Sequence, residues 1–321
     1  MTNTSPIVES DIPVSVSEPV PVSRASDPDV HIFDRIVNPI PPPALMLIGM
    51  ISFQFGAAFS KDLFSMASAP GLAFLRSAWG AVFLFLIFRP NVGRLNRNQI
   101  ITISGMGVST AAMGLLYFLA LDRIPLGIAT AIAFSGPFIL AMMGARQASQ
   151  LIWVVVAASG VVLLAPWGAS GVDPVGFALA GLAGLCYTGY MLLTKRAGQT
   201  VPSNDALPLA MGIAAILMAP FGIVSAGTDL VQPKLLVLVG VTAIMSNVLP
   251  YMLEFNALKR VTASLYAVLI SLDPAVSAIA GVIVLGEGLG ARGYVAIGLI
   301  CLGSMMANRA FARANRVSAA A

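Results

Sequence analysis

The chain has 321 residues, of which 58% are hydrophobic and only 10% are charged, and its mean hydropathy is +0.89. A soluble domain carries about 25% charged residues, so this composition excludes a surface that faces water on all sides. The net charge is +4, and the basic residues occur singly or in small groups between apolar runs. This distribution argues against nucleic-acid binding and is typical of membrane-protein loops. The lipid bilayer is therefore an expected partner of the chain.

Few residues of the chain suit metal or cofactor chemistry. Cys186 and Cys301 both lie inside apolar runs, and the only histidine, His31, lies near the N-terminus. We therefore predict no disulfide framework and no metal site. The sequence also lacks a phosphate-binding loop of the ATP-binding kind, so we expect no cofactor and no enzyme.

Residues 1–43 are rich in proline, serine, valine and acidic residues and end in three prolines. No basic segment leads into a short apolar stretch near Met1, so this is not a secretory signal peptide. The composition predicts a disordered cytoplasmic tail.

From Ala44 onward, apolar runs alternate with short polar breaks. A helix needs about 20 residues to cross the hydrocarbon core, and the shortest breaks force adjacent helices to be antiparallel neighbours. The sequence predicts an all-α polytopic membrane protein with ten transmembrane helices. They span residues 44–60, 71–88, 99–120, 126–144, 150–166, 174–194, 206–225, 234–255, 263–285 and 291–308.

Basic residues are distributed unevenly between the predicted loops. With a cytoplasmic N-terminus, eleven lysines and arginines lie in cytoplasmic loops or in the C-terminal tail, residues 309–321. Four lie on the opposite side: Lys61, Arg123, Lys234 and Arg292. The positive-inside rule predicts that both termini are cytoplasmic, in a multi-pass protein of the inner membrane.

The two halves of the membrane part share short motifs. Residues 120–125 (ALDRIP) resemble residues 257–262 (ALKRVT), and Gly136-Pro137 corresponds to Asp273-Pro274 at the same shift of 137 residues. Five spans per repeat is an odd number, so the second copy must be inverted relative to the first. Inverted repeats are typical of secondary transporters, with the substrate site near the midplane between the copies. The predicted repeats are residues 44–166 and 174–308.

Several motifs occur in a fixed order along the membrane part: QFGAAFSKDLF from Gln54, APG from Ala69, Leu75-Arg76, IPLGIA from Ile124, Ser135-Gly136-Pro137, Leu249-Pro250-Tyr251, Asp273-Pro274 and Gly286-Glu287. Together they resemble the threonine and homoserine exporters of the EamA family, in the drug/metabolite transporter superfamily. The resemblance implies a ten-helix exporter driven by an ion gradient or by the gradient of its own substrate. Those exporters usually carry glutamate where this chain has Asp273.

Arg76 and Asp273 lie well inside predicted spans, with apolar residues around them, where a charge is costly to bury. Arg76 can hold a substrate carboxylate through two parallel hydrogen bonds; the alternatives are an ion pair with Asp273 or Glu254, or snorkelling to the surface. Asp273 precedes Pro274, which favours a helix kink. This acid can bind substrate or carry a coupling proton, or it can be a static partner of Arg76.

Other polar residues are weaker candidates. Glu254 either pairs with Lys259 or Arg260 at the cytoplasmic surface or lines the cavity, and Lys61 is interpreted as an interfacial anchor. Pro137 is the second predicted kink. The neutral candidates for binding substrate, each of which can also serve only in helix packing, are Gln54, Tyr117, Asn247, Tyr251 and Ser271. A stripe of small residues on the sixth span predicts close helix packing: Gly176, Ala180, Gly184 and Thr188.

The sequence thus favours a secondary transporter that exports amino acids or related small metabolites. One alternative is the same fold with a drug, nucleoside or purine as cargo. Two more distant alternatives are a membrane-embedded enzyme, which needs a clustered nucleophile or metal set, and a sensor that signals through its N-terminal tail.

Overall fold

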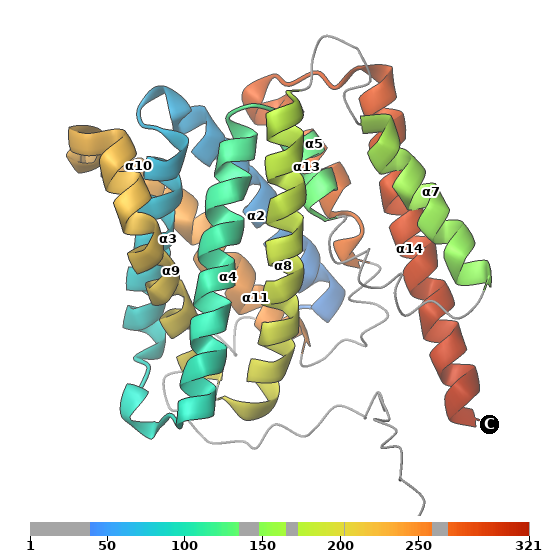
Figure 1. Ribbon diagram of the computed structural model, residues 1–321, viewed down its shortest axis with the longest axis horizontal. Coiled ribbons are helices and arrows are strands. Elements are labelled where there is room, and N and C mark those ends of the chain that lie inside the picture. Colours follow the sequence, from blue (N-terminus) through green and yellow to red (C-terminus); the bar gives the residue numbers. More distant parts are fainter. Residues whose placement is uncertain (1–38, 135–147, 165–172, 202, 259–268, 321) are drawn as a thin grey trace, which may run out of the picture. The chain divides into compact units, whose positions relative to one another are not determined.

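The computed structural model describes residues 39–134, 148–164, 173–201, 203–258 and 269–320. From Ile40 onward these ranges belong to one unit, Ile40–Ala321, and every regular element in them is a helix (Figure 1). The predicted tail lies outside the described residues up to residue 38. The helices are α2 (Pro42–Asp62), α3 (Ala69–Phe88), α4 (Arg97–Leu121), α5 (Leu126–Ala133), α7 (Ala148–Leu164), α8 (Pro174–Thr200), α9 (Ser203–Ala226), α10 (Pro233–Ala243), α11 (Leu249–Leu258), α13 (Asp273–Leu285) and α14 (Gly290–Ala320).

The described part of the chain contains seven helices that are long and apolar enough to cross a membrane. This confirms the prediction of a helical, multi-pass membrane protein. Helices α5, α7 and α13 lie outside these seven spans and are shorter. Undescribed segments follow α5, flank α7 and end four residues before α13. The count of ten spans and the inverted repeat therefore stay predictions.

Caps that can be recognised in the sequence fix where several helices begin. The Ser68 hydroxyl accepts a hydrogen bond from the Gly71 amide at 3.3 Å at the start of α3. Asn96 and Gln99 form a reciprocal capping box at the start of α4, with bonds of 2.8 and 2.9 Å. Such caps satisfy amide groups that have no partner inside the helix.

The predicted eighth span, residues 234–255, contains a π-helical segment, η5 (Ile244–Val248), between α10 and α11. Pro250 explains the widening, because proline lacks an amide proton and its ring clashes with the carbonyl one turn earlier. The Leu249 amide accordingly donates to the Ile244 carbonyl, five residues back. Such π segments frequently occur at functional sites.

The ninth predicted span differs from the structure in one detail that matters for the site. Asp273 is not inside a continuous helix: a turn at residues 271–272 precedes it, and Asp273 is the first residue of α13. The predicted kink at Pro274 stays a prediction, because residues 259–268, which precede this turn, lie outside the described part of the chain. Pro274 lies in the first helical turn, where a missing amide proton breaks no hydrogen bond. Pro137, the other predicted kink, lies outside the described residues.

The C-terminal helix also runs further than predicted. We expected its span to end at residue 308, but α14 continues to Ala320. The segment beyond residue 308 is rich in alanine and arginine, which are strong helix formers.

Helices distant in sequence pack side by side (Figure 1). Helix α14 packs along α7, α4 packs against α8 and α9, and α2 packs against α11 and α13. The stripe of small residues on α8 packs closely, as predicted, against the turn between α4 and α5 and against α5 itself. A Cβ atom at Gly176 would lie 2.8 Å from the Ile124 side chain, and one at Gly184 would lie 2.5 Å from the Ala133 carbonyl oxygen.

Candidate functional site

Arg76, in the middle of α3, is the most unusual polar residue of the described structure. Its guanidinium carbon lies 4.7 Å from the centroid of the buried Phe118 ring, and such a cation–π contact is worth about 2 kcal/mol when desolvated. The Nη1 atom is buried and has no hydrogen-bond partner among the described residues. A buried donor without a partner is rare in native proteins and points to a ligand, a strained group or a catalytic role.

The π segment and two tyrosines surround Arg76. The side-chain amide of Asn247 donates to the Arg76 backbone carbonyl at 3.1 Å, which ties η5 to α3. Tyr117 and Tyr251 both lie close enough to interact electrostatically with the guanidinium. Residues of four different helical segments therefore meet around one cation.

Gln54 and Asp273 form a second part of the site, where α2 packs against α13. The Gln54 Nε2 atom donates to Asp273 Oδ1 at 2.9 Å, and the Gln54 side chain is fully buried. The other amide atom, Gln54 Oε1, is buried without a hydrogen-bond partner. The site therefore contains one buried donor and one buried acceptor that the described residues do not satisfy.

Tyr117 connects the two parts. Its hydroxyl lies 2.7 Å from the Thr130 hydroxyl, so α4 and α5 are joined by a buried hydrogen bond. Tyr117 interacts electrostatically with both Arg76 and Asp273. We refer to Gln54, Arg76, Tyr117, Asn247 and Asp273 as the central cluster.

A second polar group, which we call the turn clamp, ties three chain turns together. Lys61 Nζ lies 2.5 Å from Glu287 Oε1 and donates to the Ile124 carbonyl at 2.8 Å. Glu287 Oε2 accepts a hydrogen bond of 2.7 Å from the Leu126 amide, the first residue of α5. Because Pro125 gives α5 no side-chain cap, the Glu287 carboxylate satisfies the positive end of this helix from a distant part of the chain.

Gly286 positions the acidic residue of the turn clamp. It ends α13 in the left-handed conformation, with φ of +66°, which glycine adopts without steric cost. The Glu287 amide then donates a hydrogen bond of 3.1 Å to the Gly281 carbonyl. The interpretation of Lys61 as a simple interfacial anchor misses its ion pair with Glu287. The available signal in the sequence was the Gly286-Glu287 pair, which places an acidic residue in a turn.

An exposed ion pair lies at the start of α8. Arg123 Nη1 is 2.7 Å from Asp173 Oδ2, and the Val175 amide donates to Asp173 Oδ1 at 2.8 Å. The hydrogen bond from Arg123, and then that from the Val175 amide, holds the pKa of the Asp173 carboxyl below its usual value. This pair joins the α4–α5 turn to α8.

The structure thus brings Gln54 and Asp273 into direct contact, and it places Asn247 and Tyr117 at Arg76. Tyr117 also interacts electrostatically with Asp273. Among the described residues no ion pair joins Arg76 to Asp273, so that alternative does not hold. Ser271 is buried in the turn before α13. The Glu254 side chain lies outside the described part. Phe118 and Thr130 were not predicted, because their sequence neighbourhoods are simply apolar.

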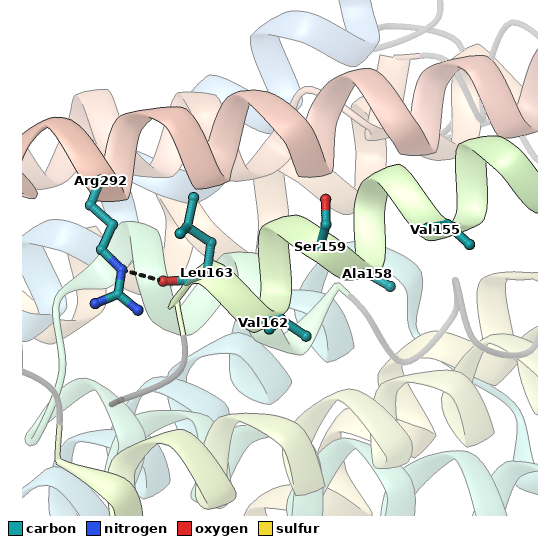
Figure 2. A pocket seen from close by; sticks show the side chains of 6 residues that line it. All are labelled: Val155, Ala158, Ser159, Val162, Leu163 and Arg292. Carbon is teal, nitrogen blue, oxygen red and sulfur yellow. Dashed lines mark hydrogen bonds between the residues drawn. The ribbon is translucent and has the colours of Figure 1, made fainter. Parts of the chain in front are cut away.

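An apolar hollow between α7 and α14 has a different character (Figure 2). It is lined by Val155, Ala158, Ser159, Val162, Leu163 and Arg292. The Arg292 Nε atom donates to the Leu163 carbonyl at 2.8 Å, and the Ser159 hydroxyl donates to its own helix. The hollow therefore suits lipid rather than a polar solute. No group of three side chains suited to a metal ion occurs among the described residues.

Comparisons with known proteins decide the family. Residues 174–309 match the EamA-like transporter family. The chain is 37% identical over 268 residues to the threonine/homoserine exporter RhtA of Escherichia coli K12, covering 82% of this chain and 90% of the relative. The chain belongs to the EamA-like transporter family. It is 38% identical, with the same coverage, to RhtA of Salmonella typhimurium LT2.

A solved structure supports the fold. The chain matches a structure described only as a crystal structure of a protein, with a TM-score of 0.57 and 18% identity. The match covers 84% of this chain and 99% of that one. The chain is thus a multi-pass membrane transporter of the EamA family, with the central cluster buried among its helices.

Proposed function

We propose that the protein is a secondary transporter that exports small amino acids of the threonine and homoserine kind across the inner membrane. The observation that carries the proposal is the 37–38% identity to threonine/homoserine exporters over 90% of their length. The central cluster agrees with such a substrate, since it holds a cation whose Nη1 atom is buried and a buried acid, Asp273, both within electrostatic reach of Tyr117.

Arg76 is the proposed anchor for the substrate carboxylate. A planar guanidinium can bind a carboxylate through two parallel hydrogen bonds, and Nη1 has a donor to offer. Asn247 holds the backbone at this position, and the Phe118 ring holds the guanidinium from one face. The positively charged side chain is thus held in place before the substrate arrives.

The proposed mechanism is alternating access between two inverted repeats, residues 44–166 and 174–308. The turn clamp joins the end of α2 to the α4–α5 and α13–α14 turns, so opening at this end requires these contacts to break. From the distribution of basic residues, we place this end outside and both termini in the cytoplasm. Asp273 is the proposed carrier of a coupling proton.

Flux through proteoliposomes tests the function. Purified protein is reconstituted with excess unlabelled L-threonine inside, and entry of labelled L-threonine is measured with L-homoserine, a purine, a nucleoside and a cationic drug as competitors. We expect threonine and homoserine to compete and the other solutes not to. Preferential competition by the purine, nucleoside or drug would instead support the same fold with a different cargo.

The same vesicles test the proposed site. Arg76→Ala and Asp273→Asn should each reduce threonine flux by at least about tenfold, the effect of losing one hydrogen bond to a charged group. Unchanged flux in both variants, with normal folding, would remove the central cluster from the proposal while leaving the cargo intact.

Topology is tested by labelling. In a variant with Cys186 and Cys301 replaced by alanine, single cysteines are placed at residues 123 and 260 and treated in intact cells with a membrane-impermeant maleimide. Because the two positions correspond in the predicted repeats, inverted copies should put residue 123 outside and residue 260 in the cytoplasm. Labelling of both from one side would rule out the inverted arrangement.

A further inference from the structure

Among the residues that the structure describes, two buried atoms of the central cluster have no hydrogen-bond partner, and these two atoms have opposite chemical character. Arg76 Nη1 is a cationic donor and Gln54 Oε1 is a neutral acceptor. Each such atom lowers stability by about 1–3 kcal/mol unless something satisfies it. A ligand that satisfies both must offer an acceptor to one atom and a donor to the other.

The orientation of the Gln54 amide follows from its neighbour. Gln54 Nε2 faces Asp273 Oδ1 at 2.9 Å. The flipped amide would place Oε1 against a carboxylate oxygen, which has no proton to share when ionised. Asp273 therefore fixes Oε1 as the outward acceptor, and a ligand donor bound to it lies beside a carboxylate.

A protonated amine fits this combination best. An ammonium group carries three N–H donors and a positive charge, so it can donate to Oε1 while the negative charge of Asp273 attracts it. A neutral hydroxyl offers one donor and gains nothing from the charge. The negative pole beside Gln54 and the positive pole at Arg76 both lie within electrostatic range of Tyr117.

The helices that carry the two poles are held by one segment. The π segment η5 contacts both α2 and α3. Asn247 bonds the Arg76 carbonyl, and the Ser52 hydroxyl, two residues before Gln54, donates to the Met245 carbonyl at 2.7 Å. The spacing between the poles is therefore set by well-packed backbone rather than by mobile side chains.

We propose that Gln54, oriented by Asp273, is a specificity-determining residue that binds the ammonium group of a zwitterionic substrate whose carboxylate lies on Arg76. This inference rests on the proposed function, and it specifies that a solute must carry both charged groups. Organic acids without an amine and amines without a carboxylate each leave one pole unsatisfied and bind more weakly.

The test measures competition against labelled L-threonine in counterflow, which avoids errors from analogues that leak across the bilayer. The competitors are L-threonine, 3-hydroxybutanoate, which lacks the ammonium group, and L-threoninamide, which lacks the carboxylate. Both analogues should compete at least about tenfold more weakly than threonine on the unmodified protein. Equal competition by 3-hydroxybutanoate would overturn the ammonium subsite while leaving threonine export intact.

Two variants then separate the poles. In Gln54→Leu, the half-inhibitory concentration of threonine should rise about tenfold while that of 3-hydroxybutanoate stays unchanged, and discrimination against threoninamide should persist. In Arg76→Gln, the half-inhibitory concentration of threonine should also rise, while that of threoninamide stays unchanged. Ser60→Ala is the control on the same helix, because the Ser60 hydroxyl donates only to the Gly56 carbonyl one turn earlier.

The outcomes are distinct. If Gln54→Leu weakens threonine and 3-hydroxybutanoate by the same factor, Gln54 has only a structural role and the inference is wrong. If Gln54→Leu does not fold, Gln54→Asn, which keeps an amide but retracts it by one methylene, should show the same loss of discrimination. If the unmodified protein carries no threonine, the proposed function fails, and the inference fails with it.

Discussion

The turn clamp and the central cluster are both partly or fully buried polar groups, yet they differ in how completely their hydrogen bonds are made. In the clamp, Lys61 has two partners and both oxygens of Glu287 are bonded. In the central cluster, Arg76 and Gln54 each retain a buried atom that has no hydrogen-bond partner within the described part of the chain. The clamp is chemically complete by itself, whereas the central cluster is not.

This difference separates two roles that look alike in the sequence. Satisfied polar networks stabilise a particular conformation, while unsatisfied buried groups lower stability and persist where function requires them. The clamp therefore has the properties of a conformational lock, and the central cluster those of a binding site. Mutations can test the distinction, because the two groups should respond in opposite ways.

The largest expected effect comes from Arg76→Met, which replaces the guanidinium with an apolar side chain. We expect threonine flux to fall by about 100-fold, the upper range for a hydrogen bond to a charged group. The melting temperature should stay about the same or rise, because removing a charged group whose buried Nη1 atom has no hydrogen-bond partner among the described residues offsets the loss of the Phe118 contact. Flux is measured in proteoliposomes and stability by thermal unfolding in detergent.

The matched control for Arg76→Met is Arg196→Met, which removes an arginine that is exposed on α8. It should leave flux near the unmodified value. A large drop in melting temperature for Arg76→Met would mean that Arg76 is structural, and the contrast between the two clusters would disappear.

Mutations in the turn clamp should lower stability, in contrast to Arg76→Met. We expect Glu287→Gln and Lys61→Met each to lower the free energy of unfolding by about 1–3 kcal/mol, since each leaves a partly buried charge without its partner. Thermal unfolding measures this loss. Stability equal to the unmodified protein in both variants would show that the clamp contributes nothing to the folded state.

A charge swap sharpens the test of the clamp. In a simple ion pair, Lys61→Glu combined with Glu287→Lys restores the attraction. Here the swap should fail, because the new glutamate would face the Ile124 carbonyl and the new lysine would face the Leu126 amide. Recovery of stability in the double variant would mean that the backbone contacts are unimportant.

Much of the fold could be predicted from sequence because the bilayer imposes strong constraints on length and hydropathy. The predicted spans 44–60 and 71–88 lie close to α2 and α3. The break before Asp273 could not be predicted, because a proline in an apolar run is compatible with both a kink and a helix start. The π segment could not be predicted from the sequence either, since it depends on how the backbone before Pro250 adjusts to that proline.

The site was predictable in its residues but not in its contacts. Costly ionic residues in apolar spans identified Arg76 and Asp273 directly. The contacts of these residues were harder to predict. Whether Gln54 forms a hydrogen bond with Asp273 or serves only in packing depends on how α2 packs against α13. The partner of Lys61 lies 226 positions away at Glu287, and no local pattern predicts such a pairing.

Tyr117 and Thr130 offer a smaller test of the central cluster. Tyr117→Phe should destabilise the protein by about 1–2 kcal/mol, because the buried Thr130 hydroxyl loses its partner. Adding Thr130→Val should recover most of that stability, since both polar groups are then absent. Thermal unfolding of the two single variants and the double variant gives the coupling energy. Additive losses would show that the two hydroxyls do not interact.

The smallest expected effect is the pH dependence of the exposed Arg123–Asp173 pair. The folded-state pKa of Asp173 lies below its usual value, which is about 3.9 in an unfolded chain. The contribution of this carboxylate to stability is therefore complete above about pH 4 and is lost as pH falls through the lowered folded-state pKa. Asp173→Asn should retain the cap on Val175 but lose this part of the acid dependence, as measured by unfolding between about pH 5 and pH 3.

The control is Asp229→Asn, which removes the same charge from a carboxylate that bonds Gln232 rather than an arginine. A solvent-exposed ion pair contributes little because water screens it, so the acid effect of Asp173 should be smaller than the loss caused by Glu287→Gln. If Asp173→Asn proved the more damaging of the two, burial would not be what distinguishes the clamp, and the α4–α5 turn would be held mainly by its exposed partner on α8.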